Sequence, residues 1–467
     1  MSETPPVTEL LAGAGFPAAE VADWAAAAPG RPGPLPAAAA AVSAFLTRGQ
    51  DLLRRLPGRA RCTAAEQAAR DALVAALTGA REEFLAGHTG ALYAQLTGRH
   101  SSWLRLAELM EAAAAFVPGL VPSPAEMAAE RARGLPDKEG LELAQGLLAA
   151  HVLALPEPGR HLCEAMLRPL PAAQDHLARL RATGVVDLGP ARVTRDGRAG
   201  LLELRNPRHL NAEDDTTLTA TECAVDLILL DPAIEVGVFR GGVVQHPRYR
   251  GQRVFGSGIN LTHLYAGRIG FLFYLARDMG YVSKIYRGLL PAGARADLAG
   301  PGGIEKLWVA AVEQFAIGGA CQLLHVVDHV IAVRGARLFL PARKEGIIPG
   351  ASNLRLPRFV GDRAARQAIL SGREWVAGEP DADMLCDEVV EPGEMDRAIA
   401  HRVAALTNSG LVNATANRRT LRAGQEPLDA FREYMAIYAR EQAHCHLSPA
   451  LVRNLETHWQ ARERTLR

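Results

Sequence analysis

The chain has 467 residues, of which 48% are hydrophobic, so it is long enough for two or three domains with buried cores. Its 52 basic and 51 acidic residues give a net charge of +1, which argues against a nucleic-acid partner or an anionic membrane surface. The six cysteines lack paired spacing, and the N-terminal stretch has no basic segment before an apolar run. We therefore expect a reduced, cytoplasmic protein without a signal peptide or membrane span.

Both ends of the chain predict helices. Residues 1–185 predict a helical N-terminal domain, because stretches such as 63–98 carry apolar residues at intervals of three and four. Prolines near 30–36, 117–124 and 155–158 separate these helices. Residues 396–467 are again helical in pattern, and we expect this C-terminal segment to serve in oligomerisation or as a lid.

The middle of the chain, residues 186–395, predicts strands alternating with helices and therefore an α/β arrangement. Residues 184–207 alternate and are interrupted by Asp-Gly, which predicts a hairpin. Residues 223–242 contain an apolar run expected as a buried strand, with a second strand after the proline. Residues 329–341 predict another short strand pair around Arg-Gly. Helical patterns are expected at 211–230 and 303–316.

Small residues interrupt an apolar run at Gly318, Gly319 and Ala320. Between a strand and a helix, such residues leave backbone N–H groups unpaired at the helix start and let an oxygen atom approach them. This is the physical form of an oxyanion hole, although a Gly-Gly turn is often only tight packing. A second turn of this kind, at 254–261, could supply another N–H donor to the same carbonyl oxygen.

Two further stretches complete the pattern. Residues 205–218 lead from a strand through a proline into an acidic helix start that Asn211 is expected to cap, and residues 339–361 hold proline-bounded turns. In this order and spacing, the four stretches resemble the crotonase (enoyl-CoA hydratase/isomerase) superfamily over about residues 190–395. The matching residues are Asn206, Pro207, Asn211, Ala212, Ser257, Gly258, Ile259, Asn260, 317–321, Asp328, Phe339, Pro341 and 348–351.

The resemblance implies a crotonase-like ββα superhelix as an acyl-CoA-binding catalytic core at 186–395. It also implies that the backbone N–H groups of Ile259 and Gly319 are the oxyanion-hole donors. The family's hydratases carry two glutamates where this chain has Gln322 and Ala342. Because adding water to a double bond needs an acid and a base, plain hydration is not expected.

A narrower resemblance extends over nearly the whole chain. The helical ends together with 246–251 and 255–261 are similar to the arylacetyl-CoA dioxygenases of dihydroxyphenylglycine biosynthesis for glycopeptide antibiotics. That branch implies oxidation of (3,5-dihydroxyphenyl)acetyl-CoA by O2 to the arylglyoxylate and free CoA, with no metal and no organic cofactor. It also implies a homo-oligomer, either a trimer or a hexamer built as a dimer of trimers, with neither nucleic acid nor membrane as a partner.

This resemblance assigns roles to individual side chains. Glu213 and Arg277 would face the ring hydroxyls, Gln322 would contact the ring, and Leu261 and Ile347 would line a small apolar O2 pocket. The positions implied for CoA and the thioester are His246, Pro247, Arg248, Tyr249, Ser257, Gly258, Asn260, Leu261 and Thr262, with Gln442 closing the site. The base that removes the α-proton is not evident from the sequence.

Simpler interpretations stand beside these roles. Glu213 could merely complement a helix dipole, Arg277 could be an ordinary ion-paired arginine, and Gln322 could be a buried amide. The spacing of His325 and His329 suits metal ligands but lacks further partners, so no metal site is expected. The alternative functions are a thioester hydrolase or isomerase of the same fold, and an acyl-CoA-binding protein without catalytic activity.

Overall fold

The computed structural model describes residues 5–30, 33–294, 303–408 and 410–464. The chain forms two compact units: Met1–Leu162, Tyr265–Leu272 and Met435–Val452 make the first, and Cys163–Leu264, Phe273–Tyr434 and Arg453–Arg467 make the second. The C-terminal helices are therefore shared between the units instead of forming a separate segment. All six cysteines are free thiols. Within the described ranges, no helix is both long and apolar enough to cross a membrane.

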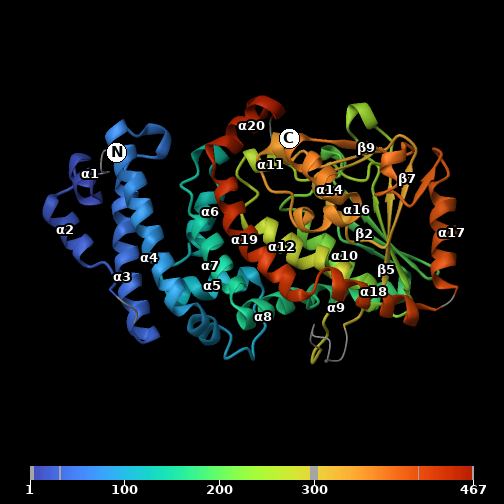
Figure 1. The fold of residues 1–467 in the computed structure, drawn as a ribbon, viewed down its shortest axis with the longest axis horizontal. Helices are drawn as coiled ribbons and strands as arrows, with labels where there is room; N and C mark the ends of the chain where they lie inside the picture. Colours follow the sequence, from blue (N-terminus) through green and yellow to red (C-terminus); the bar gives the residue numbers. More distant parts are fainter. Residues whose placement is uncertain (1–4, 31–32, 295–302, 409, 465–467) are drawn as a thin grey trace. The chain divides into compact units, whose positions relative to one another are not determined.

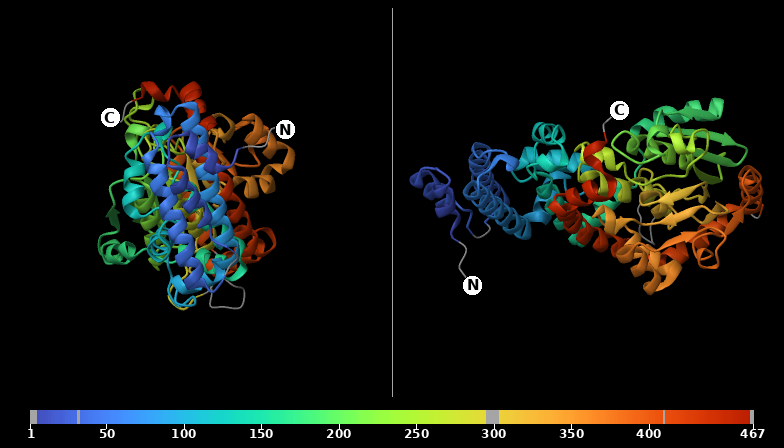
Figure 2. Two further views of the ribbon diagram at one scale, coloured as in Figure 1. Left: turned by 90° about the vertical axis from the view of Figure 1, so that its left-hand side faces the viewer. Right: turned by 90° about the horizontal axis from the view of Figure 1, so that it is seen from above.

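The first unit is helical, as its sequence predicts, and α3 lies beside α4 in it (Figures 1 and 2). Helix α4 begins after Thr63, whose side chain accepts a hydrogen bond from the Glu66 N–H while the Glu66 carboxylate bonds back to the Thr63 N–H. The helices that belong wholly to this unit and precede residue 155 are α1 (Val7–Gly13), α2 (Ala18–Ala26), α3 (Leu35–Arg55), α4 (Ala64–Leu96), α5 (Leu106–Phe116), α6 (Pro124–Arg131) and α7 (Glu142–Ala154).

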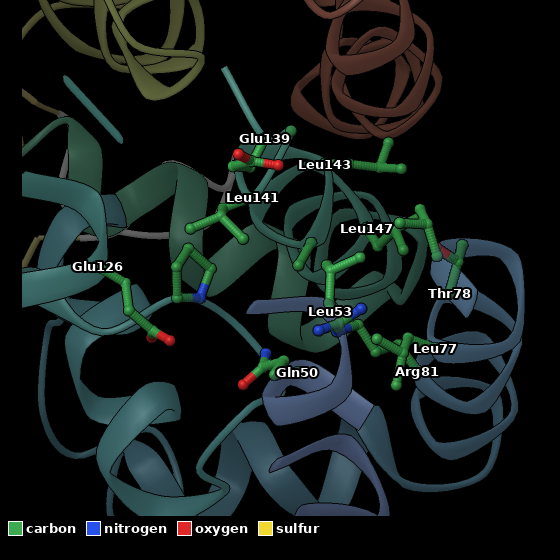
Figure 3. Close-up of a pocket in the computed structure, with 14 residues that line it drawn as sticks. Gln50, Leu53, Leu77, Thr78, Arg81, Glu126, Glu139, Leu141, Leu143 and Leu147 are labelled. Carbon is green, nitrogen blue, oxygen red and sulfur yellow. The ribbon is translucent and has the colours of Figure 1, made fainter. Parts of the chain in front are cut away.

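A small cavity of about 40 Å³ lies in the first unit. Figure 3 shows Gln50 and Leu53 of α3, Arg81 of α4 and Leu147 of α7 around it. The Arg81 guanidinium donates to the carbonyl oxygens of residues 119 and 120 and so ties α4 to the loop before α6. The cavity is far too small for an acyl-CoA, and we interpret it as a packing defect among helices.

The second unit is built on a seven-stranded sheet with the order β1-β2-β3-β4-β5-β7-β10. Strands β1 to β3 are antiparallel, and the turn between β2 and β3 confirms the predicted hairpin, whereas the pairs from β3 to β10 are parallel. The strands are β1 (Val185–Asp187), β2 (Ala191–Asp196), β3 (Ala199–Leu204), β4 (Val236–Gly241), β5 (Leu307–Val312), β7 (His329–Val333) and β10 (Glu388–Val390). A smaller sheet has the order β6 (Phe315–Ile317), β8 (Arg337–Phe339), β9 (Glu374–Val376).

Helices cover both faces of the large sheet, as a parallel sheet requires. Trp308 and Ala310 of β5 pack in one apolar cluster with α10 (Leu218–Leu230), whereas Leu307 and Val309 pack in another with α17 (Met395–Thr407). Helix α17 lies against β5 and β7 in Figure 1. The remaining helices are α8 (Pro156–Met166), α9 (Pro171–Thr183), α11 (Leu261–Tyr265), α12 (Leu272–Arg277), α13 (Ser283–Arg287), α14 (Gly319–Leu323), α15 (Ala342–Glu345), α16 (Ser352–Arg366), α18 (Leu411–Gln425), α19 (Leu428–His446) and α20 (Pro449–Trp459).

Some local expectations are wrong. The run expected as a buried strand at 223–230 is the end of α10, and the helix expected at 303–316 is absent, with the interior strand β5 in the middle of that stretch. Both segments are buried on all sides, so their apolar residues follow neither a helical nor a strand period. Asn211 caps no helix: its side chain donates to the carbonyl oxygens of residues 242 and 254, and α10 begins at Leu218. The strands predicted at 329–341 exist, but they belong to different sheets.

Candidate active site

The two glycine turns meet in the structure. Gly256 forms a bridge with the strand β6, accepting from the Ile317 N–H at 3.0 Å. Gly258 has a φ of 82°, and a Cβ atom at this position would lie 2.8 Å from the Ile317 oxygen and 3.0 Å from the Gly319 nitrogen. Only glycine fits such a position, so the predicted convergence of the two turns is present.

The backbone around these turns leaves two N–H groups available. The Gly318 N–H donates to the Phe339 oxygen at 2.9 Å, and Gly319 is the first residue of α14. The Asn260 N–H donates to the Glu213 oxygen at 2.8 Å. In the part of the chain that the structure describes, neither the Ile259 N–H nor the Gly319 N–H has an acceptor. These are the two N–H groups that the family resemblance predicts as oxyanion-hole donors.

A buried polar cluster lies directly against the Gly319 turn. The Arg277 Nε donates to Glu213 Oε2 at 2.6 Å, and its Nη1 donates to Gln322 Oε1 at 2.9 Å. Its Nη2 donates to the Gly319 carbonyl oxygen at 2.6 Å. A Cβ atom at Gly319 would lie 2.6 Å from Glu213 Oε2. The three predicted ring-binding side chains are therefore brought together beside one predicted oxyanion donor.

Two members of this cluster were not predicted. The Tyr281 hydroxyl donates to Glu213 Oε1, and the Arg277 Nη1 also donates to Asp278 Oδ1 at 3.0 Å. Both oxygens of Glu213 are therefore engaged within the protein. Tyr281 follows Arg277 by four residues, but the helical stretch is kinked between them at Gly280, which has a φ of -85° and a ψ of -115°. The spacing of the two residues in the sequence therefore does not by itself predict their contact.

The cluster holds more acidic groups than cations. Burial raises the pKa of Asp278, although Arg277 opposes this shift. Burial also raises the pKa of Tyr281 well above its ordinary value. Burial disfavours the charge on Arg277, but Glu213 and its neighbours outweigh this effect and raise the Arg277 pKa. Arg277 is thus held as a permanent cation among acceptors.

The residues predicted to hold CoA lie along the second turn and the loop before it. Asn260 donates to Asp214 Oδ2 at 2.9 Å and accepts from the His263 N–H, which fixes the start of α11. The Ser257 hydroxyl donates to the His209 carbonyl oxygen at 3.1 Å. Pro247 and Arg248 are exposed, whereas His246 and Tyr249 are half-buried. The Arg248 guanidinium lies 5.3 Å from the centre of the Tyr249 ring, and the role of these residues in holding CoA stays a prediction.

Four further positions with predicted roles lie on α11, α15 and α19 or directly beside them. Leu261 and Thr262 open helix α11 and are half-buried, and Ile347 follows α15 and is also half-buried. The O2 pocket assigned to Leu261 and Ile347 stays a prediction. Gln442 is buried in α19, in the portion that belongs to the first unit, and its closing role stays a prediction as well.

One group of possible metal ligands occurs among the described residues. Asp214, Asp215 and His263 bring their ligand atoms within 4.8 Å of one another. However, Asp214 Oδ2 already accepts hydrogen bonds from Asn206 and Asn260, each at 2.9 Å. Through these hydrogen bonds Asp214 joins the turns that contain Asn206 and Asn260, and we assign no ion to the three residues.

The other reactive side chains near the site are sequestered. Burial raises the pKa of the Cys321 thiol to about 12, so it is protonated at neutral pH and unsuited to nucleophilic attack. Burial lowers the pKa of His325 to about 3, and its Nδ1 contacts the Ser352 hydroxyl at 3.2 Å. His329 begins β7, so the two histidines do not share a helix face.

The chain belongs to the enoyl-CoA hydratase/isomerase, or crotonase, superfamily of acyl-CoA enzymes: the family profile matches residues 302–445, and one relative is 47% identical over 398 residues. That relative is the (3,5-dihydroxyphenyl)acetyl-CoA 1,2-dioxygenase of Amycolatopsis orientalis, and the alignment covers 85% of this chain and 90% of the relative. The predicted family and its fold class, an α/β core with helical regions at both ends, are thereby confirmed.

More distant relatives match a smaller part of the chain. A probable enoyl-CoA hydratase of Rhizobium meliloti (strain 1021) is 29% identical over 205 residues, which are 44% of this chain and 69% of that protein. Among solved structures, an enoyl-CoA hydratase of Mycobacterium avium subsp. paratuberculosis K-10 is 19% identical with a TM-score of 0.48. This match covers 60% of the present chain and 100% of that one.

Proposed function

We propose that the protein is a dioxygenase that converts (3,5-dihydroxyphenyl)acetyl-CoA and O2 into (3,5-dihydroxyphenyl)glyoxylate and CoA. The observation that carries this proposal is the 47% identity to a relative named for that activity, which extends over 85% of the chain. The hydratase of Rhizobium meliloti, by contrast, aligns with 44% of it. Gln322 and Ala342 also leave the site without the two glutamates that the hydratase reaction would use.

The proposed reaction begins with an enolate. The thioester oxygen would accept from the Ile259 and Gly319 N–H groups, which are free of other acceptors among the described residues. Donors of this kind, fixed in a dry site, stabilise developing negative charge by about 2.7–4 kcal/mol each. Loss of one α-proton then gives a carbanion that is both benzylic and adjacent to the thioester, and such a carbanion is readily oxidised.

The enolate can pass an electron directly to O2, so we propose that neither a metal nor an organic cofactor takes part. The resulting radical pair would combine to a peroxide at the α-carbon. Attack of the peroxide on the thioester carbonyl expels CoA, and cleavage of the O–O bond with loss of the second α-hydrogen gives the keto acid. Substrate and O2 together supply every atom of the two products.

Ring recognition would depend on the Glu213 cluster, defined as Glu213, Arg277, Asp278, Tyr281 and Gln322. Arg277 and Tyr281 hold both Glu213 oxygens in place, so a ring hydroxyl would meet an oriented carboxylate. We further propose that Leu261 and Ile347 line the O2 niche, that 246–249 and 257–262 hold CoA, and that Gln442 closes the site. A homotrimer or homohexamer, a cytoplasmic location and a place in antibiotic biosynthesis belong to the same proposal.

Incubation of the full chain with (3,5-dihydroxyphenyl)acetyl-CoA, with and without O2, tests this function. We expect CoA release and arylglyoxylate formation only when O2 is present. CoA release without O2 would instead identify a thioester hydrolase, and rearrangement of the acyl group without CoA release an isomerase. Binding without turnover would indicate a protein without catalytic activity. Metal analysis of the active preparation, with dialysis against a chelator, tests independence from metals.

A further inference from the structure

The carboxylate of Glu345 is a buried acidic group without a partner. Glu345 is the last residue of the short helix α15 and is 8% exposed. Among the described residues, no donor forms a hydrogen bond or an ion pair with its carboxylate. A buried carboxylate without a hydrogen bond is costly, so its retention calls for a role.

Glu345 lies at the junction of the two turns. Its Oε1 is 3.8 Å from the position that a Cβ atom on Gly318 would occupy, and the Gly258 Cα is 3.6 Å from the same position. Gly318 and Gly258 directly precede the two N–H donors at residues 319 and 259. A carbonyl oxygen bound there sits about 2.9 Å from each nitrogen, and its α-carbon is only two bonds further on. The acyl α-carbon would therefore lie within reach of this carboxylate.

The other carboxylates beside the turns are already engaged. Glu213 accepts from Arg277 and Tyr281 through its two oxygens. Asp278 accepts from Arg277 at 3.0 Å. Each of these groups would have to give up an ion pair before it could take a proton from a C–H bond. Glu345 would lose no ion pair or hydrogen bond to the described residues when it takes up a proton.

The surroundings of Glu345 favour proton uptake. Burial raises its pKa to about 7, and no charged neighbour contributes to this shift. A base with a pKa near the working pH combines a useful ionised fraction with a real affinity for the proton. Its neutral acid form is also the form that burial favours.

We propose that Glu345 is the base that removes the α-proton of the bound arylacetyl thioester. This inference rests on the proposed function. A Glu345 carboxylate oxygen forms the new O–H bond, and the electrons of the broken C–H bond form the enolate C=C bond. The negative charge moves to the oxygen held by the Ile259 and Gly319 N–H groups. When CoA leaves as a thiolate, it takes up this proton, and the carboxylate is restored.

Hydrogen exchange at the α-carbon tests the base without requiring O2. The full chain is incubated anaerobically with (3,5-dihydroxyphenyl)acetyl-CoA in D2O, and α-deuteration is followed by mass spectrometry. We expect exchange with the wild type and a loss of about 100-fold or more with Glu345→Gln, as for removal of a general base. The dissociation constant for the thioester should change less than threefold. The matched control is Lys344→Gln, on the exposed side of α15, which should exchange like the wild type.

The outcomes separate this inference from the function on which it rests. Exchange by Glu345→Gln within a few-fold of the wild-type rate would overturn the assignment of Glu345 as the base. Binding of the thioester by the wild type without any exchange would overturn it as well. Exchange by the wild type without O2 uptake would overturn the dioxygenase and leave the base in place. Thermal melting of each variant reports on folding. If Glu345→Gln is unfolded, Glu345→Asp keeps the acid but moves it, and exchange at an undiminished rate by that folded variant would also overturn the assignment.

Discussion

Two buried charge clusters of the second unit differ in the sign of their excess. In the Glu426 cluster, one carboxylate accepts from the guanidinium groups of Arg287, Arg355 and Arg358 at 2.7–3.0 Å. Burial opposes the ionisation of Glu426, but Arg355 and the other arginines outweigh it and hold the Glu426 pKa well below its usual range. In the Glu213 cluster, a single guanidinium is surrounded by acidic and neutral acceptors instead.

This difference separates a structural cluster from a candidate site. The Glu426 cluster joins α13, α16 and the end of α18, which are distant in sequence. The charge of its Arg355 also reaches Asp278 of the other cluster, where it opposes the rise of the Asp278 pKa. The Glu213 cluster touches the Gly319 turn and contains groups whose pKa is raised by burial. Several cations hold one carboxylate in its ionised form in the Glu426 cluster, whereas in the Glu213 cluster one guanidinium orients several acceptors beside the Gly319 turn.

The largest expected effect is on stability, from Glu426→Gln. The substitution leaves two buried arginines and the half-buried Arg358 without their shared carboxylate, and removal of one partner from a buried pair costs about 3–5 kcal/mol. Urea unfolding of the wild type and the variant measures the change. The control is Arg366→Gln, which breaks an exposed pair with Asp362 and should leave the free energy of unfolding close to that of the wild type. If the free energy of unfolding falls by less than about 1 kcal/mol in Glu426→Gln, the Glu426 cluster does not stabilise the fold as we expect.

The next effect is on turnover, from Gly319→Ala. The added Cβ atom would lie 2.6 Å from Glu213 Oε2 and 3.3 Å from Arg277 Nη2, so it would push the cluster away from the oxyanion donor. We expect turnover to fall about 100- to 1,000-fold, the range for loss of an oxyanion-hole donor. The measurement is O2-dependent CoA release.

The matched control for that variant is Gly424→Ala. Gly424 lies within α18, and a Cβ atom there would meet no atom within 4 Å. Its turnover should equal that of the wild type, and its stability should be unchanged or slightly raised, because alanine favours a helix. Full activity in Gly319→Ala would show that the close packing of the Gly319 turn against Glu213 and Arg277 does not matter for the reaction.

Much of this site could be predicted because its parts are local sequence patterns. The two glycine turns need small residues for close backbone approach, and that requirement is visible in the sequence at Gly258 and Gly319. The association of Glu213 with Arg277 came from the family resemblance, not from spacing. Tyr281 escaped notice because a kink at Gly280 interrupts the helix between it and Arg277, so no regular spacing predicts their contact.

Other features depend on tertiary contacts that no local pattern encodes. The strands at 329–333 and 337–339 look like a hairpin, yet they pair in different sheets. The apolar runs of α10 and β5 predict the wrong class of element, because burial on every side removes the alternation that distinguishes a strand from a helix. Glu345 was missed since only the folded chain brings its carboxylate against Gly318.

The smallest expected effect is on the acid dependence of stability, and it sharpens the contrast between the clusters. The pKa of Glu426 is lower in the folded than in the unfolded chain, so its contribution is complete above the unfolded pKa of about 4.3 and falls as the pH drops below it. At pH 4 this one group should cost roughly 0.6 kcal/mol relative to neutral pH. Asp278 has a raised pKa, so its term has the opposite sign: ionisation in the folded chain is disfavoured, and stability from this group decreases as the pH rises above its unfolded value. Urea unfolding of the wild type and Glu426→Gln at pH 7 and pH 4 measures how the Glu426 contribution to stability depends on pH. The difference in stability between the two proteins should be smaller at pH 4, and an equal difference at both values would mean that Glu426 titrates alike in the folded and unfolded chains.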